Sequence, residues 1–154
     1  MARLHAGLTS DELFGLGPIP EEDQDLELSR QMYSRAAAGG VLEAAVRMAK
    51  ASEDGNYGGA QDFSEALRYW KLAEAIVVKR DEADPDRVSQ YGDVELYQVS
   101  AAQAALLLSG GPNLDPDPAE AARLYGKASE SAMRAGRFKT AEEYMMLGEE
   151  AGGM

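Results

Sequence analysis

The sequence contains no cysteine and only one histidine among its 154 residues. Without cysteine, the chain has no disulfide, no thiolate nucleophile and no ligand for a cysteine-bound zinc. With His5 as its single histidine, the chain lacks the residues of a hydrolytic triad or of a His-rich metal site. We therefore expect no catalytic residue, no resident metal and no cofactor in this chain.

Basic residues and long apolar runs are also scarce. Lys and Arg number 15 against 27 Asp and Glu, a net charge of −12, which repels phosphate backbones and anionic membranes and favours basic protein surfaces. No stretch approaches the roughly 20 apolar residues that span a bilayer, and the N-terminus lacks the apolar run of a signal peptide. We expect a cytoplasmic chain that binds no nucleic acid and no membrane.

One segment occurs three times, at 25–38, 62–75 and 117–130. Each copy opens with Asp and places bulky residues and a late Ala at helical spacing, so that one stripe of each helix is apolar. A period near the 37 residues that separate positions 25 and 62 is typical of helix-pair solenoids. A small Ala lets neighbouring helices approach and an aromatic fills the gap between repeats, so the predicted repeat core is Tyr33, Ala36, Tyr69, Trp70, Ala73, Leu124, Tyr125 and Ala128.

The segments between the copies complete the predicted helix pairs. Partner helices are expected at about 41–54 and 93–109, each followed by glycine, and a last helix at 138–151. Residues 77–92 are charged and contain proline and glycine, which predicts an inserted acidic loop. Residues 1–24 are interpreted as a partial repeat end followed by a Gly- and Pro-containing connector, and the chain as a fragment of a longer protein.

The repeated Asp also predicts where the helices begin. Asp62 and Asp117 can accept hydrogen bonds from the first free N–H groups as N-caps. Glu65 and Glu120 follow three residues later, at the spacing of a capping box.

Residues 54–65 match part of a calcium-loop pattern as well. Asp54, Asn56, Asp62 and Glu65 stand where side-chain oxygens would surround the ion. No second loop is present to pair with this one, and the repeat already uses two of the four residues as a helix start. We interpret the segment as a turn and keep calcium binding as the weaker alternative.

Two consecutive patterns carry a family resemblance: A-x-x-x-M-A-x-x-S-x-x-G at 44–55 and D-x-x-E-A-x-x-Y-W-x-x-A at 62–73. Together they resemble a Sel1-like repeat, a relative of tetratricopeptide repeats. Nearly the whole chain is similar to the C-terminal helical region of eukaryotic elongation factor 2 kinases, through QDFSEALRYWKLAEA, LLLSGGPNLDPDP, AARLYGKASESAMRAGRF and a final YMMLGEEA. The resemblance implies an all-α fold, an α-solenoid of Sel1-like and TPR-like helix pairs over residues 25–151 that ends in a C-terminal helix.

In that family an alpha-type catalytic domain and a calmodulin-binding segment precede the repeats, which help to present the elongation factor for phosphorylation. The resemblance therefore implies a non-catalytic substrate-docking domain. Its implied partners are translation elongation factor 2 and the kinase's own catalytic domain with calmodulin. A free-standing Sel1-like adaptor with an unknown protein partner is the alternative.

The resemblance assigns docking of the elongation factor to the last helix, 138–151. Periodicity predicts a partial inner face for that helix, made of Phe138, Ala141, Met145 and Leu147. Tyr144 and Met146 cannot both join this stripe, and packing and partner contact remain open for them. The family's helix tends to finish with an aromatic residue, whereas this chain ends in Gly-Gly-Met. The implied partner-binding residues are Tyr144, Met145, Met146, Glu149 and Glu150.

Overall fold

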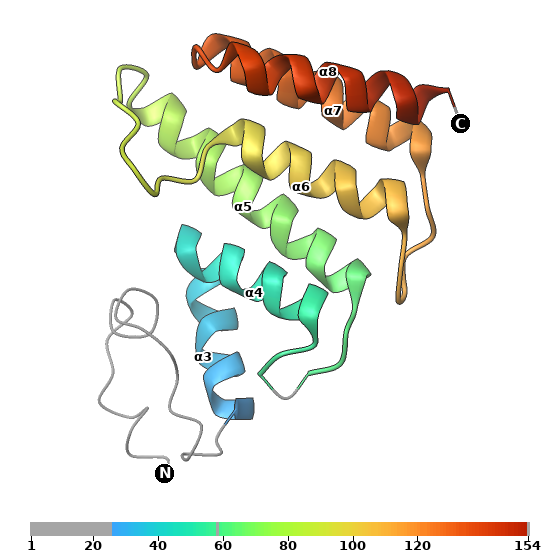
Figure 1. Ribbon diagram of the computed structural model, residues 1–154. Helices are drawn as coiled ribbons and strands as arrows, with labels where there is room; N and C mark the ends of the chain where they lie inside the picture. Colours follow the sequence, from blue (N-terminus) through green and yellow to red (C-terminus); the bar gives the residue numbers. More distant parts are fainter. Residues whose placement is uncertain (1–25, 58, 154) are drawn as a thin grey trace. The chain divides into compact units, whose positions relative to one another are not determined.

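The computed structural model describes residues 26–57 and 59–153, which form six α-helices (Figure 1). The helices are α3 (Leu26–Ala38), α4 (Leu42–Asp54), α5 (Phe63–Ala83), α6 (Leu96–Ser109), α7 (Pro118–Arg134) and α8 (Phe138–Gly152). The described residues contain no strand beyond one isolated bridge, and the predicted all-α class is confirmed. The partial repeat end and connector predicted at 1–24 lie outside the described residues.

The chain divides into two compact units, one up to Leu72 and one from Ala73 onwards. The first unit contains α3, α4 and the beginning of α5, and the second contains the rest of α5 with α6, α7 and α8. In the part of the chain that the structure describes, no helix is long and apolar enough to cross a membrane.

In the first unit, alanines let the helices approach and aromatic rings fill the space between them. The side chains of Tyr33 and Trp70 are buried, and each satisfies its polar atom at the edge of the core. The Tyr33 hydroxyl accepts a hydrogen bond from Arg47 at 2.9 Å. The Trp70 indole N–H donates to the Glu53 carboxylate at 2.8 Å, which ties α5 to α4.

In the second unit, a partly buried polar network ties three helices together. Gln103 of α6 is almost fully buried and donates to Glu74 of α5 at 2.7 Å. The Lys127 ammonium of α7 donates to the other carboxylate oxygen of Glu74 at 2.6 Å. The buried Gln103 amide and the partly buried Glu74 carboxylate are therefore paired with each other.

The predicted repeat-core positions are buried with one exception. Ala36 is only half-buried, because Ala37 takes the inward position at the end of α3. The buried positions are Tyr33, Tyr69, Trp70, Ala73, Leu124, Tyr125 and Ala128.

The N-caps lie where the repeated Asp predicts them, but the capping boxes do not form there. The carboxylate of Asp62 accepts from the Glu65 N–H at 3.0 Å, and Asp117 repeats this contact with the Glu120 N–H at 3.1 Å. The N–H of Asp62 instead donates to the carbonyl of Ser52, and that of Asp117 donates to the corresponding carbonyl of α6. Because these N–H groups already have acceptors, the side chains of Glu65 and Glu120 are left for other partners. A complete capping box occurs only at the start of α6, among the helix starts that the structure describes.

The turn between α6 and α7 depends on a glycine. Gly110 has φ 63° and ψ 179°, a conformation that is essentially restricted to glycine. A Cβ at this position would lie 2.6 Å from a ring carbon of Pro116, so no other residue fits without moving the turn.

The inserted loop begins later than predicted, because α5 continues through 77–83 with Val77 buried on its apolar stripe. The loop that follows is organised by its own arginines. Arg87 donates to Asp93 at 2.9 Å and to Glu95 at 2.6 Å, and Arg80 of α5 donates to Glu95 at 3.3 Å. The insert is therefore a folded element that fixes the start of α6.

Candidate protein-binding surfaces

Small residues form the inner face of α8. Ala141 and Ala151 are both 1% exposed, and a Cβ at Gly148 would lie 3.2 Å from the Cβ of Tyr125 on α7. Between them, Tyr144 stacks on Tyr125 with 6.2 Å between ring centroids. Helix α8 therefore lies close against α7, which runs beside it in Figure 1.

The predicted inner face of α8 was wrong except at Ala141. Phe138, Met145 and Leu147 are 66%, 51% and 37% exposed. The large apolar residues predicted the wrong face of α8, because the face that packs closely on α7 has room only for small side chains. Packing and partner contact were both open for Tyr144, and the structure shows packing against Tyr125. Burial is the main cause that raises the pKa of the Tyr144 hydroxyl.

The opposite side of α8 presents apolar and acidic side chains to solvent. Met145 and Met146 are 51% and 56% exposed, and Glu149 and Glu150 are exposed one turn further on. We call these four residues the outer face of α8. Flexible, polarisable methionines beside carboxylates suit a protein partner with an apolar contact and basic groups around it.

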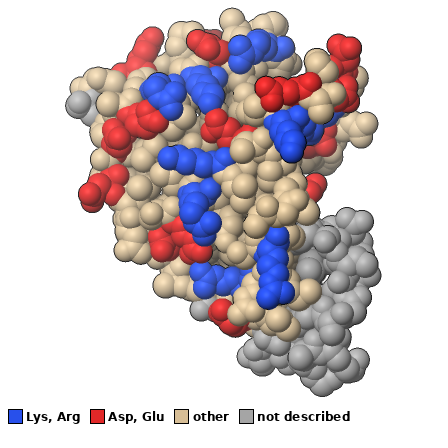
Figure 2. Space-filling model, turned by 180° about the vertical axis from the view of Figure 1, so that it is seen from behind, with Lys and Arg blue, Asp and Glu red and all other residues tan. Residues whose placement is uncertain are grey.

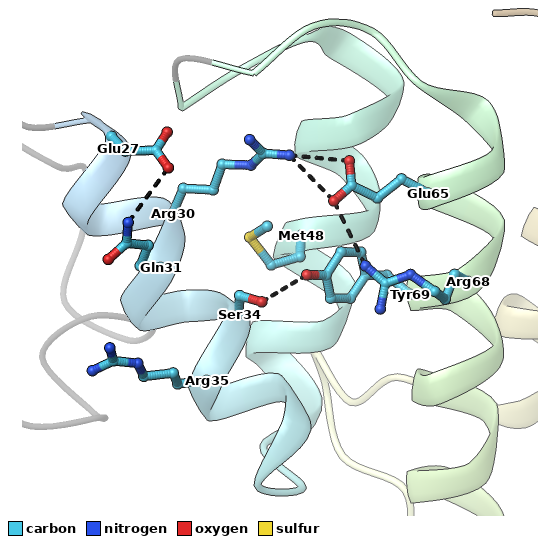
Figure 3. A pocket seen from close by; sticks show the side chains of 9 residues that line it. All are labelled: Glu27, Arg30, Gln31, Ser34, Arg35, Met48, Glu65, Arg68 and Tyr69. Atoms are coloured by element: carbon cyan, nitrogen blue, oxygen red, sulfur yellow. Dashed lines mark hydrogen bonds and ion pairs between the residues drawn. The ribbon is translucent and has the colours of Figure 1, made fainter. Parts of the chain in front are cut away.

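A groove of 370 Å³ lies in the first unit, between α3 and the start of α5 (Figure 3). Arg30 reaches across it and donates through Nη2 to both oxygens of Glu65, at 3.2 and 3.1 Å. Nearby, the hydroxyls of Ser34 and Tyr69 share a hydrogen bond of 2.8 Å. The residues that line this groove are Glu27, Arg30, Gln31, Ser34, Arg35, Met48, Glu65, Arg68 and Tyr69, and we call it the arginine groove.

The arginine groove was missed in the sequence, although a signal for it exists. The pairs Arg30 with Glu65 and Ser34 with Tyr69 are each separated by 35 residues, close to one repeat. Residues one repeat apart lie on equivalent helices, so polar side chains at this separation are candidates for a shared surface.

Two of the four residues of the calcium-loop pattern have other side-chain contacts in the structure. Asp62 caps α5, and the carboxylate of Glu65 binds Arg30. Within residues 26–57 and 59–153, no group of three or more His, Cys, Asp or Glu is placed to hold a metal ion. These contacts favour the turn interpretation.

A second hollow of 510 Å³ lies in the other unit, between the inserted loop and the end of α7. Beside it, the loop exposes Val88 and Tyr91, with relative exposures of 77% and 108%. On the face seen in Figure 2, acidic and basic side chains are interspersed over the described residues.

Comparison with known proteins supports the resemblance found in the sequence. The chain is 31% identical over 123 residues to the eukaryotic elongation factor 2 kinases of Rattus norvegicus and Mus musculus, and 30% identical to that of Homo sapiens. The matched region covers 76% of this chain but only 16% of each kinase. The predicted likeness to the repeat region of these kinases is thus confirmed.

The family model for the Sel1 repeat matches residues 8–41, 42–75 and 96–132. The first match begins at residue 8, inside the segment interpreted as a partial repeat end and connector. Because the three matches together cover more than half of the chain, the chain belongs to the Sel1 repeat family.

Proposed function

We propose that this chain is the substrate-docking region of a cytoplasmic, calmodulin-dependent elongation factor 2 kinase. In this role it presents translation elongation factor 2 to an alpha-type catalytic domain elsewhere in the polypeptide. The similarity to three mammalian elongation factor 2 kinases supports the choice of partner. The exposed apolar side chains of the described residues support a role in protein binding.

The observation that carries this proposal is the outer face of α8. Its two methionines stay about half exposed although α8 is packed against α7 through small residues. A helix that is anchored on one side and apolar on the other can dock a partner without reorganising, which lowers the entropy cost of binding. Glu149 and Glu150 add complementarity to basic groups on the partner.

Binding of the chain to purified elongation factor 2, measured by biolayer interferometry, tests this proposal. The double substitution Met145→Ser and Met146→Ser is expected to weaken binding about tenfold, since truncating central apolar contacts commonly costs more than 1 kcal/mol. Val88→Ser is the matched control, because it also removes an exposed apolar side chain but lies in the inserted loop. Equal affinity of the double variant and the unmodified chain would exclude the outer face as the docking surface.

A free-standing Sel1-like adaptor is the second candidate, favoured by the fact that the repeats alone cover most of this chain. It predicts that the unmodified chain does not bind elongation factor 2. The reading frame of the gene separates the two candidates as well, since only the first requires an alpha-type kinase domain upstream.

A further inference from the structure

The arginine groove has a charge opposite to that of the whole chain. Its lining contains three arginines and two glutamates, whereas the chain carries a net charge of −12. A local positive excess in an acidic protein attracts anionic groups selectively, because the surrounding field repels them elsewhere.

Arg30 is held in place from two sides. The Glu65 carboxylate is bound through Nη2 of Arg30, and the backbone of Gly59 lies against the guanidinium, so that a Cβ at this glycine would be 3.1 Å from Cζ. Since a guanidinium carries five N–H donors, a second anion can be bound while the Glu65 contact persists. The Arg30 side chain is 30% exposed, which leaves it accessible from the groove.

Arg68 faces the same groove from α5 (Figure 3). Its guanidinium lies 4.5 Å from the centroid of the Tyr69 ring and 3.6 Å from Glu65. Stacking on the ring orients the planar group without using its N–H donors. The side chain is 65% exposed, so these donors are available to a ligand.

The floor of the groove is closed and its wall supplies hydroxyls. Met48 lines the groove and is 1% exposed, so the groove ends at the core. The Ser34 and Tyr69 hydroxyls share one hydrogen bond and retain acceptor capacity for a backbone N–H.

We propose that the arginine groove binds an acidic side chain of an extended peptide, with Arg30 and Arg68 as donors to its carboxylate. Arg35, at the other end of the groove, adds a positive charge for a second acidic residue. A singly charged carboxylate fits better than a phosphate group, because Glu27 and Glu65 in the same lining repel a dianion more strongly. The arginine groove shares no residue with the outer face of α8, and its proposed role does not depend on the function proposed for that face.

Fluorescence anisotropy of three labelled peptides tests this assignment: Gly-Glu-Gly-Glu-Gly, its Gln counterpart and its phosphoserine counterpart. The unmodified chain is expected to bind the Glu peptide more tightly than the Gln peptide. Arg68→Gln is expected to weaken binding of the Glu peptide about fivefold, as expected for one lost charge-assisted contact. Arg123→Gln, which removes an arginine of α7 that is 61% exposed, is expected to leave the affinity unchanged.

Backbone amide NMR shifts locate the bound peptide. Shifts confined to α3 and the first turns of α5 support the proposal, and circular dichroism melting of each variant checks that the fold is intact. Equal binding of the Glu and Gln peptides, or equal losses in Arg68→Gln and Arg123→Gln, would overturn the site. If the phosphoserine peptide binds more tightly than the Glu peptide and Arg68→Gln abolishes that binding, the assignment of the groove to carboxylates is overturned.

Discussion

Trp70 stabilises the first unit through both the ring and the N–H group of its indole. The indole is 7% exposed and packs in the core, while its N–H donates to Glu53 of α4. Trp70→Ala is expected to lower the free energy of unfolding by about 3 to 5 kcal/mol, the usual cost of deleting a large buried aromatic. Urea denaturation measures this loss, and Tyr91→Ala, in the fully exposed position of the inserted loop, is the matched control. A loss no larger than that of the control would place Trp70 outside the core.

Glu74 makes the second unit sensitive to acid. Burial alone would raise the pKa of this carboxyl, but hydrogen bonds from Lys127 and Gln103 outweigh burial, and the folded-state pKa lies below the ordinary value. A lowered folded-state pKa stabilises the protein above the unfolded-state pKa, and this stabilisation is lost as the pH falls through the folded-state pKa.

Glu74→Gln is therefore expected to destabilise the chain by about 1 kcal/mol at pH 7. The difference from the unmodified chain should shrink as the pH falls below the ordinary glutamate range, because both chains then carry a neutral group. Thermal melting between pH 7 and pH 3 measures this convergence. A difference that grows on acidification would contradict the network.

At the scale of elements, α8 depends on the small size of Gly148. A side chain there meets Tyr125 and the Ala122 carbonyl of α7 at 3.2 and 3.4 Å. Gly148→Val is expected to cost about 1 to 3 kcal/mol and to loosen α8 from α7, since overpacking forces the helices apart. Hydrogen exchange of the amides in 138–152 reports the loosening.

Gly126→Val provides the control for this substitution. A Cβ at Gly126 meets nothing within 4 Å, so the change should leave stability within about 0.5 kcal/mol, the usual range for exposed sites. If both valine variants behave alike, a helix-propensity effect rather than close packing explains the result at Gly148.

The starts of α5 and α7 were predictable from local chemistry, whereas the long-range contacts of these helices were not. Asp62 and Asp117 predict an N-cap, because a short carboxylate can accept a hydrogen bond from a free N–H group in the first turn of any helix. The partner of Glu65 could not be predicted in this way, since Arg30 lies 35 residues away. The inner face of α8 was mispredicted because close approach to α7 favours Ala141 and Gly148 over larger apolar residues.

At the scale of the whole molecule, the repeat accounts for the fold, and we propose that the exposed surfaces account for function. The repeated aromatic positions are buried in both units, and the repeated alanines are buried except Ala36. What the repeat does not use stays at the surface: the outer face of α8 and the arginine groove. A repeat pattern therefore predicts a binding scaffold, while its partner depends on the side chains that the pattern leaves free.

In the proposed function, α8 docks the elongation factor at a distance from the chemistry. Its most direct test compares two substrates of the full-length kinase that we propose carries this chain, after deletion of 138–154 and, separately, with Met145→Ser and Met146→Ser. We predict that phosphorylation of a short peptide is retained in both variants. The kcat/KM for the intact factor should fall about tenfold, because only that substrate uses the remote docking surface. An equal loss for both substrates, or no loss for either, would contradict the account.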